Sequence, residues 1–133
     1  MTYPNENRSG KNGKKLKMVI EGNKLIAEVQ EEFNGYFPYL RIEFYRHRQG
    51  DEKNGIEKLN GTQRLQHAVG VSDKFVIMVD KNDKISTLKK QFNKVGFGVL
   101  VYRKAGKVWV ETTLTEDWTL ERQNIEGELF SRK

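Results

Sequence analysis

Two stretches of the chain place apolar side chains along one face of a helix. Both follow the spacing i, i+3, i+7, i+10, and they are offset by 59 residues. The two sets are Ile26, Val29, Phe33 and Tyr36, and Ile85, Leu88, Phe92 and Val95. Asn23 and Asp83 precede them as polar residues suited to N-capping. The pattern predicts two equivalent helices, and therefore an internal repeat.

Extended segments are predicted on both sides of each helix. They cover residues 16–20 and 39–46 around the first helix, and 75–80 and 98–103 around the second. The continuous apolar run from Phe75 to Val79 favours a strand that is covered on both faces or lies in the middle of a sheet. A further strand at 107–113 would form a hairpin with 98–103 through a tight turn at Gly106.

These elements predict an α+β fold built from duplicated β-α-β units. Their mostly antiparallel sheet, with the helices on one face, would be related to the ferredoxin-like arrangement. A C-terminal hairpin and a short helix over residues 115–123, capped by Thr115, would complete the fold. The connection over residues 49–73 is rich in glycine, asparagine and charge, and is expected to be irregular. Three apolar residues would anchor it: Leu59, Leu65 and Val69.

Composition separates a basic tail from the folded part. Residues 1–15 have almost nothing to bury, so we expect a disordered basic tail, followed by a single α+β domain over residues 16–133. The net charge is +6, and residues 1–17 contribute +4 of it, with five basic side chains against Glu6. The segment from residue 111 to 128 carries six acidic side chains and one arginine, so the two ends of the chain could attract each other.

The sequence offers no catalytic, cofactor-binding or metal-binding set of residues. The chain has no cysteine, which excludes disulfides and thiolate chemistry. His47 and His67 belong to no metal-ligand spacing, and the segment beginning at Asp80 lacks the glycine and glutamate of a calcium loop. No apolar run approaches the roughly 20 residues needed to cross a bilayer. We therefore expect a non-enzymatic cytoplasmic protein with no cofactor and no membrane contact.

The first functional hypothesis is a protein–protein interaction or adaptor domain, which binds an unidentified partner or a second copy of itself. Lys89, Lys90 and Lys94 on the second helix suit an acidic partner. Trp118, an amphipathic residue in a charged stretch, is typical of an interface anchor. The edge of the terminal hairpin is a further candidate surface. The competing interpretation is that the lysines only solvate the helix and that Trp118 caps the core.

The alternative hypothesis is nucleic-acid binding through the basic tail and an aromatic, basic face of the sheet. Exposed aromatic side chains on a sheet stack on bases, and cations between them hold phosphates. The candidate residues are Arg41, Tyr45, Arg46, Arg48, Arg103, Lys104 and Lys107. Alternation along the strands limits this set, and packing of the aromatics in the core or the hairpin is the competing interpretation. The sequence does not say which face of the sheet is open.

Three segments resemble a family of small uncharacterised bacterial proteins. They are residues 37–44 (FPYLRIEF), 102–113 (YRKAGKVWVETT) and 117–121 (DWTLE). The resemblance covers roughly residues 16–127. It brings no assigned activity with it, and it therefore implies no functional residue.

Overall fold

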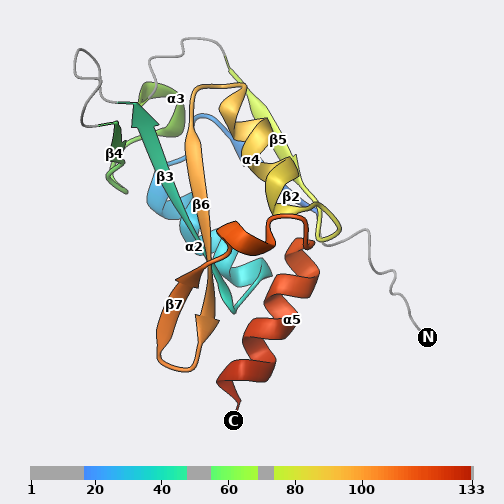
Figure 1. Cartoon of the computed structure of the whole chain (residues 1–133). Helices are drawn as coiled ribbons and strands as arrows, with labels where there is room; N and C mark the ends of the chain where they lie inside the picture. The colour runs from blue at the N-terminus through green and yellow to red at the C-terminus, as the bar shows by residue number, and fades with distance from the viewer. Residues whose placement is uncertain (1–16, 48–54, 69–73, 133) are drawn as a thin grey trace.

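A computed structural model describes residues 17–47, 55–68 and 74–132 of the chain (Figure 1). The elements follow in the order β2 (Met18–Glu21), α2 (Ile26–Tyr36), β3 (Leu40–His47), β4 (Ile56–Lys58), α3 (Leu65–Ala68), β5 (Val76–Val79), α4 (Ile85–Asn93), β6 (Gly98–Ala105), β7 (Val108–Glu111), the 3-10 helix η3 (Thr113–Thr115) and α5 (Leu120–Ser131). Every strand pair is antiparallel, which confirms the α+β class with antiparallel strands. The tail expected over residues 1–15 lies outside the described residues.

The strands form two sheets, whereas the sequence had suggested one. One sheet has four strands in the order β4-β3-β6-β7, and β2 pairs only with β5. Two strands of the first half therefore pair with their counterparts in the second half, β2 with β5 and β3 with β6. A ferredoxin-like arrangement would place all four of these strands in one sheet. The expectation of a single sheet is corrected, and the ferredoxin-like arrangement is not confirmed.

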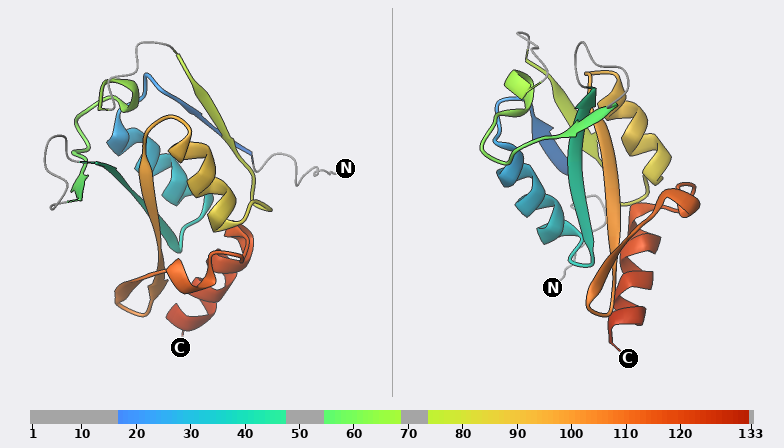
Figure 2. Two further views of the ribbon diagram at one scale, coloured as in Figure 1. Left: turned by 45° about the horizontal axis from the view of Figure 1, so that its top comes forward. Right: turned by 60° about the vertical axis from the view of Figure 1, so that its left-hand side comes forward.

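Helices α2 and α4 lie between the two sheets, with the two-stranded sheet on their far side (Figure 2). Their apolar faces and the inner faces of both sheets form one cluster of buried side chains. Buried positions recur at the offset of 59 residues: Met18 and Ile77, Ile20 and Val79, Ile26 and Ile85, Val29 and Leu88, Phe33 and Phe92, Leu40 and Val99, Ile42 and Val101. The two halves thus supply equivalent side chains to one core, each contributing about 1.5–3 kcal/mol through burial.

The turns that precede the helices bind one another through the backbone. The N–H groups of Ile26 and Ala27 donate to the carbonyls of Gln63 and Gly61, at 2.9 and 3.0 Å. Equivalent bonds in the second half run from Ile85 to Trp118 and from Ser86 to Glu116, at 3.1 and 2.9 Å. Each long helix of the core therefore begins on the turn that precedes the next helix along the chain.

The expected side-chain caps at Asn23 and Asp83 are wrong. The helices begin after Leu25 and Lys84, and neither makes a side-chain cap. Asp83 instead accepts a hydrogen bond from the N–H of Asp80 at 2.9 Å, within the turn. Carbonyls of the neighbouring turn accept the first helical N–H groups instead, and in α2 the carboxylate of Glu28 also accepts from the N–H of Leu25 at 2.9 Å.

The C-terminal helix begins later and is longer than expected. α5 is capped by Thr119, whose hydroxyl accepts from the N–H of Arg122 at 3.1 Å. The predicted helix over residues 115–123 with Thr115 as its cap is therefore wrong, and residues 113–115 form η3 instead. The hairpin before it is confirmed, with Gly106 at φ 68° in the turn between β6 and β7.

The strand β5 is not covered on both faces. Ile77 and Val79 are buried, whereas Val76 and Met78 are exposed, because β5 belongs to a sheet of two strands that has helices on one side. In the connection over residues 49–73, Leu59 and Leu65 are buried as expected. Val69 lies outside the described residues. No helix in the described part of the chain is long and apolar enough to span a membrane.

Candidate functional site: the open face of the four-stranded sheet

One face of the four-stranded sheet is left uncovered by the helices of the described chain (Figure 2). The helices pack against the face that bears Leu40, Ile42 and Val101. Residues at the alternate positions project from the opposite side. We call that side the open face and define it by Arg41, Glu43 and Tyr45 of β3, Lys58 of β4, Leu100, Tyr102 and Lys104 of β6, and Trp109 and the exposed Glu111 of β7.

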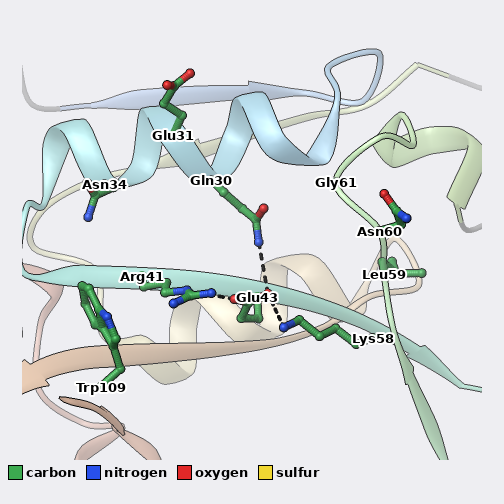
Figure 3. Close-up of a pocket in the computed structure, with 10 residues that line it drawn as sticks. All are labelled: Gln30, Glu31, Asn34, Arg41, Glu43, Lys58, Leu59, Asn60, Gly61 and Trp109. Carbon is green, nitrogen blue, oxygen red and sulfur yellow. Dashed lines mark hydrogen bonds and ion pairs between the residues drawn. The ribbon is translucent and has the colours of Figure 1, made fainter.

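Glu43 occupies the centre of the open face. Its side chain is only 6% exposed, and the Nε atom of Arg41 donates to it at 2.9 Å. The Nζ atom of Lys58 lies 3.5 Å from the carboxylate, and the Nε2 atom of Gln30 donates at 3.2 Å (Figure 3). A buried carboxylate is tolerated when it is paired and hydrogen-bonded, and Glu43 meets both conditions. Glu43 therefore holds two cations in place.

Helix α2 closes the edge of β3 beside Glu43. The carbonyls of Leu40 and Ile42 point away from β6, and they accept from the side-chain amides of Asn34 and Gln30 at 3.0 and 2.9 Å. Further along, β4 covers the same edge of β3. Backbone groups at a sheet edge otherwise remain open to another chain. This edge of β3 is therefore already satisfied.

Trp109 marks the opposite side of the open face. Its ring centroid lies 5.8 Å from the Nζ of Lys104 and 6.0 Å from the Cζ of Arg41, within the range of cation–π contacts. A groove of about 720 Å³ runs between Trp109 and α2, with Glu43 among its lining residues (Figure 3). Glu31 of α2 also lines this groove, although its carboxylate points away from Glu43.

Tyr45 and Tyr102 lie side by side on the open face, with their hydroxyl oxygens 3.4 Å apart. Burial, followed by the hydrogen bond with Tyr102, raises the pKa of Tyr45 above its ordinary value. Tyr45 is therefore neutral at physiological pH, and the two side chains offer hydroxyl groups on an aromatic surface.

Part of the set predicted to bind nucleic acid comes together on the open face. Arg41, Tyr45 and Lys104 share this face, and Tyr45 and Lys104 are half-buried. Lys107 is exposed in the hairpin turn beside this face. Arg48 lies outside the described residues.

Arg46 and Arg103 do not belong to the open face, which corrects the sequence-based grouping. Strand alternation turns both toward the helix-covered side. Arg46 pairs with Glu57 at 3.2 Å, and Arg103 donates to the side-chain carbonyl of Gln123 at 3.0 Å. The guanidinium of Arg103 also lies 5.6 Å from the ring centroid of Trp118. These arginines hold α5 and the β3–β4 pair in place.

The residues predicted to bind a protein partner lie elsewhere. Lys89 is ion-paired with Glu116, whereas Lys90 and Lys94 are exposed on α4. Trp118 is half-buried, with an arginine guanidinium 3.7 Å from its ring centroid. None of these residues is part of the open face.

Sequence reasoning missed Glu43, Lys58 and Gln30. Alternation with Arg41 and Tyr45 already places Glu43 on their face, so that residue could have been found. Lys58 and Gln30 come from other elements. No local pattern fixes how β4 and α2 meet β3.

On the open face, the carboxylate of Glu43 is saturated by three donors, and burial raises the pKa of Tyr45. Within the described residues, no group of three or more histidine, aspartate or glutamate side chains could hold a metal ion. Comparison with known proteins finds no matching family, no matching curated protein and no matching solved structure. The resemblance to a bacterial family stays a prediction.

Proposed function

We propose that this chain is a non-enzymatic binding domain that recognises an acidic segment of a protein partner through the open face. The observation that carries the proposal is the cluster of Trp109, Arg41 and Lys104 on an uncovered sheet face. Tryptophan, tyrosine and arginine are the residues that most often dominate the energy of protein interfaces. The cytoplasmic location expected from the sequence belongs to this proposal.

The charge that the open face presents to solvent is net positive, because Arg41, Lys58 and Lys104 outnumber the exposed Glu111. The side chains of Arg41 and Lys58 are 50% and 58% exposed, whereas that of Glu43 is 6% exposed. An approaching partner therefore meets the two cations before the carboxylate. Because Glu43 fixes both cations in advance, little side-chain entropy is lost on binding, which favours affinity.

The groove beside Trp109 gives this surface a place for an extended segment. Gln30 and Asn34 line one side of it, and Trp109 lines the other. Aliphatic side chains of a bound segment would lie on the tryptophan, while its carboxylates would meet Arg41 and Lys104. An acidic peptide with interspersed aliphatic residues fits this arrangement.

Nucleic-acid binding is the second candidate, and the shared face of Tyr45, Tyr102 and Trp109 favours it. One feature makes it weaker. The open face carries the cations Arg41, Lys58 and Lys104 among the acids Glu43 and Glu111, whereas nucleic-acid binding draws its affinity from many phosphate contacts.

Selection of random peptides displayed on phage against the intact chain tests the proposal. We expect the selected peptides to be rich in Asp and Glu. Trp109→Ala and Lys104→Glu should each weaken binding of a selected peptide at least about tenfold, which corresponds to about 1.4 kcal/mol. Fluorescence anisotropy of the labelled peptide measures both affinities.

Lys94→Ala is the matched control, because it removes an exposed lysine of α4 and leaves the open face intact. Unchanged peptide affinity in this variant, together with losses at Trp109 and Lys104, supports the proposal. Equal affinity of the wild type and Trp109→Ala overturns it. Binding of an oligothymidylate that depends on Trp109, with no binding of acidic peptides, replaces it with the nucleic-acid alternative.

We also infer that residues 18–68 and 76–131 are two copies of one β-α-β-β-α unit. The constant offset of the buried core positions supports this inference. The equivalent backbone bonds of the two pairs of turns support it independently. Backbone bonds of this kind do not depend on which side chains have changed since the copies diverged.

A further inference from the structure

The strand β7 forms one margin of the four-stranded sheet, and no described element lies beside its outer edge (Figures 1 and 2). Sheet edges in soluble proteins are usually protected by charge, proline, a bulge or brevity. β4, at the other margin, has three residues, two of which are charged. β7 has the sequence Val-Trp-Val-Glu, with Val108 58% and Val110 36% exposed. β7 is also short and ends in the charged Glu111, but the two exposed valines leave the middle of this edge apolar.

The backbone of Trp109 points outward from this edge. In a two-residue hairpin the closing pair, here Ala105 and Val108, is hydrogen-bonded. Hydrogen-bonded pairs then recur at every second position, as the bond from Thr112 N–H to the Val101 carbonyl at 3.1 Å shows. Trp109 falls between these pairs, so its N–H and carbonyl face away from β6.

The segment Lys107-Val108-Trp109-Val110-Glu111 is complementary to itself when two copies run antiparallel. Centred on Trp109, the pairing sets Lys107 opposite Glu111 and Val108 opposite Val110. Residues directly opposite one another lie on the same face of a sheet, and opposite charges in such pairs stabilise it. Two valine pairs would therefore form, and Lys107, which lies in the hairpin turn at the start of β7, would reach Glu111 of the other copy to form two ion pairs. The centre of symmetry also coincides with the residue whose backbone groups are free.

We propose that β7 pairs with β7 of a second copy, antiparallel and centred on Trp109, to form a dimer with a continuous eight-stranded sheet. The strand that binds this edge is β7 of a second copy, because the charges of residues 107–111 complement those of the same segment running antiparallel. One strand pair is a small interface, so we expect a weak dimer with a Kd on the order of 0.1 mM. This inference does not rest on the proposed peptide binding.

Sedimentation equilibrium of the full chain with charge-reversed variants tests the register. Lys107→Glu and Glu111→Lys should each weaken dimerisation at least about tenfold, because each places like charges opposite one another at both ends of the contact. The double variant that carries both changes should recover the wild-type Kd. Far-UV circular dichroism confirms that each variant is folded.

A second measurement uses the absence of cysteine from the chain. In the proposed register, the Cα atoms of the two copies of residue 109 lie about 5.5 Å apart, which suits a disulfide. Trp109→Cys should therefore form a disulfide-linked dimer under mild oxidation. Val108→Cys is the control and should not, because its two copies lie diagonally, about 7–8 Å apart.

A chain that is monomeric up to about 1 mM overturns the proposal. So does a dimer that Lys107→Glu leaves unchanged, or equal oxidation of the two cysteine variants. Recovery in the double variant supports the register directly. Acidic-peptide binding is measured separately, at protein concentrations well below the dimer Kd, so that failure of one proposal is distinguishable from failure of the other.

Discussion

At the scale of single residues, the open face changes the ionisation of Tyr45. Burial and the contact with Tyr102 stabilise the neutral phenol, so the pKa of Tyr45 is higher in the folded than in the unfolded chain. A raised folded pKa contributes stability that is fully present below the unfolded pKa, which is about 10 for tyrosine. That stability is lost as the pH rises above this value.

We predict that the free energy of unfolding falls as the pH rises above about 10. In the Tyr45→Phe variant this free energy should fall less steeply with pH. The contribution of one proton to the slope is at most about 1.4 kcal/mol per pH unit. Urea unfolding at a series of pH values measures both slopes. Ile125→Ala, which removes an exposed apolar side chain and no ionisable group, should keep the wild-type slope. Identical slopes for Tyr45→Phe and the wild type would contradict the prediction.

Single residues also show how far the sequence leads to the site. Alternation along β3 places Arg41, Glu43 and Tyr45 on one face, and the structure agrees. Alternation does not say which face the helices cover, and for that reason Arg46 and Arg103 were grouped with the wrong side chains. The face is decided by which side chains the helices bury, and that is a property of the packed molecule.

At the scale of elements, periodicity found the helices whose buried faces are fully apolar. α2 and α4 bury only apolar residues, and the apolar positions predicted for them begin at their first residues, Ile26 and Ile85. α5 buries Leu120, Gln123 and Gly127, while Ile125 and Leu129 are exposed. Because α5 buries an amide and a glycine, its sequence has no continuous apolar face. The first residue of this helix was therefore predicted wrongly.

Gly127 sets how closely α5 approaches β3. A Cβ atom at this position would lie 2.8 Å from the Cβ and 3.2 Å from the carbonyl oxygen of Tyr39. We predict that Gly127→Ala destabilises the fold by about 1–3 kcal/mol, because α5 must shift to relieve the overlap. Urea unfolding measures the change.

Gly35 provides the matched control within α2. A Cβ atom there meets nothing within 4 Å. Gly35→Ala should therefore stabilise the fold by about 0.5–1 kcal/mol through the higher helix propensity of alanine. Equal effects of the two substitutions would show that propensity, and not the contact with Tyr39, decides the result at Gly127.

At the scale of the whole molecule, the buried side chains of both halves form one cluster. Phe33 and Phe92 occupy equivalent places in it and are fully buried. We predict that Phe33→Ala and Phe92→Ala each cost about 3–5 kcal/mol and that each variant still unfolds in a single transition. Leu114→Ala, at an exposed position, should change the stability by less than about 0.5 kcal/mol.

Far-UV circular dichroism and tryptophan fluorescence distinguish one core from two. Both tryptophans, Trp109 and Trp118, belong to the second half, whereas the circular dichroism signal reports all helices. Coincident transitions in Phe33→Ala are expected of a shared core. A circular dichroism change that precedes the fluorescence change would show that the first half unfolds alone. The sequence predicted the repeat, but not that β2 pairs with β5 in one sheet and β3 with β6 in another, because pairing between distant strands leaves no local pattern.

The side-chain amides of Gln30 and Asn34 donate to carbonyls of β3, so those carbonyls cannot bind the N–H groups of an incoming strand. This has a consequence for assembly. Linear polymers built by strand addition need an adhesive margin at each end of every subunit. Here one margin of the four-stranded sheet is sealed by these amides and by a short, charged β4, so the proposed pairing at β7 would stop after the first addition.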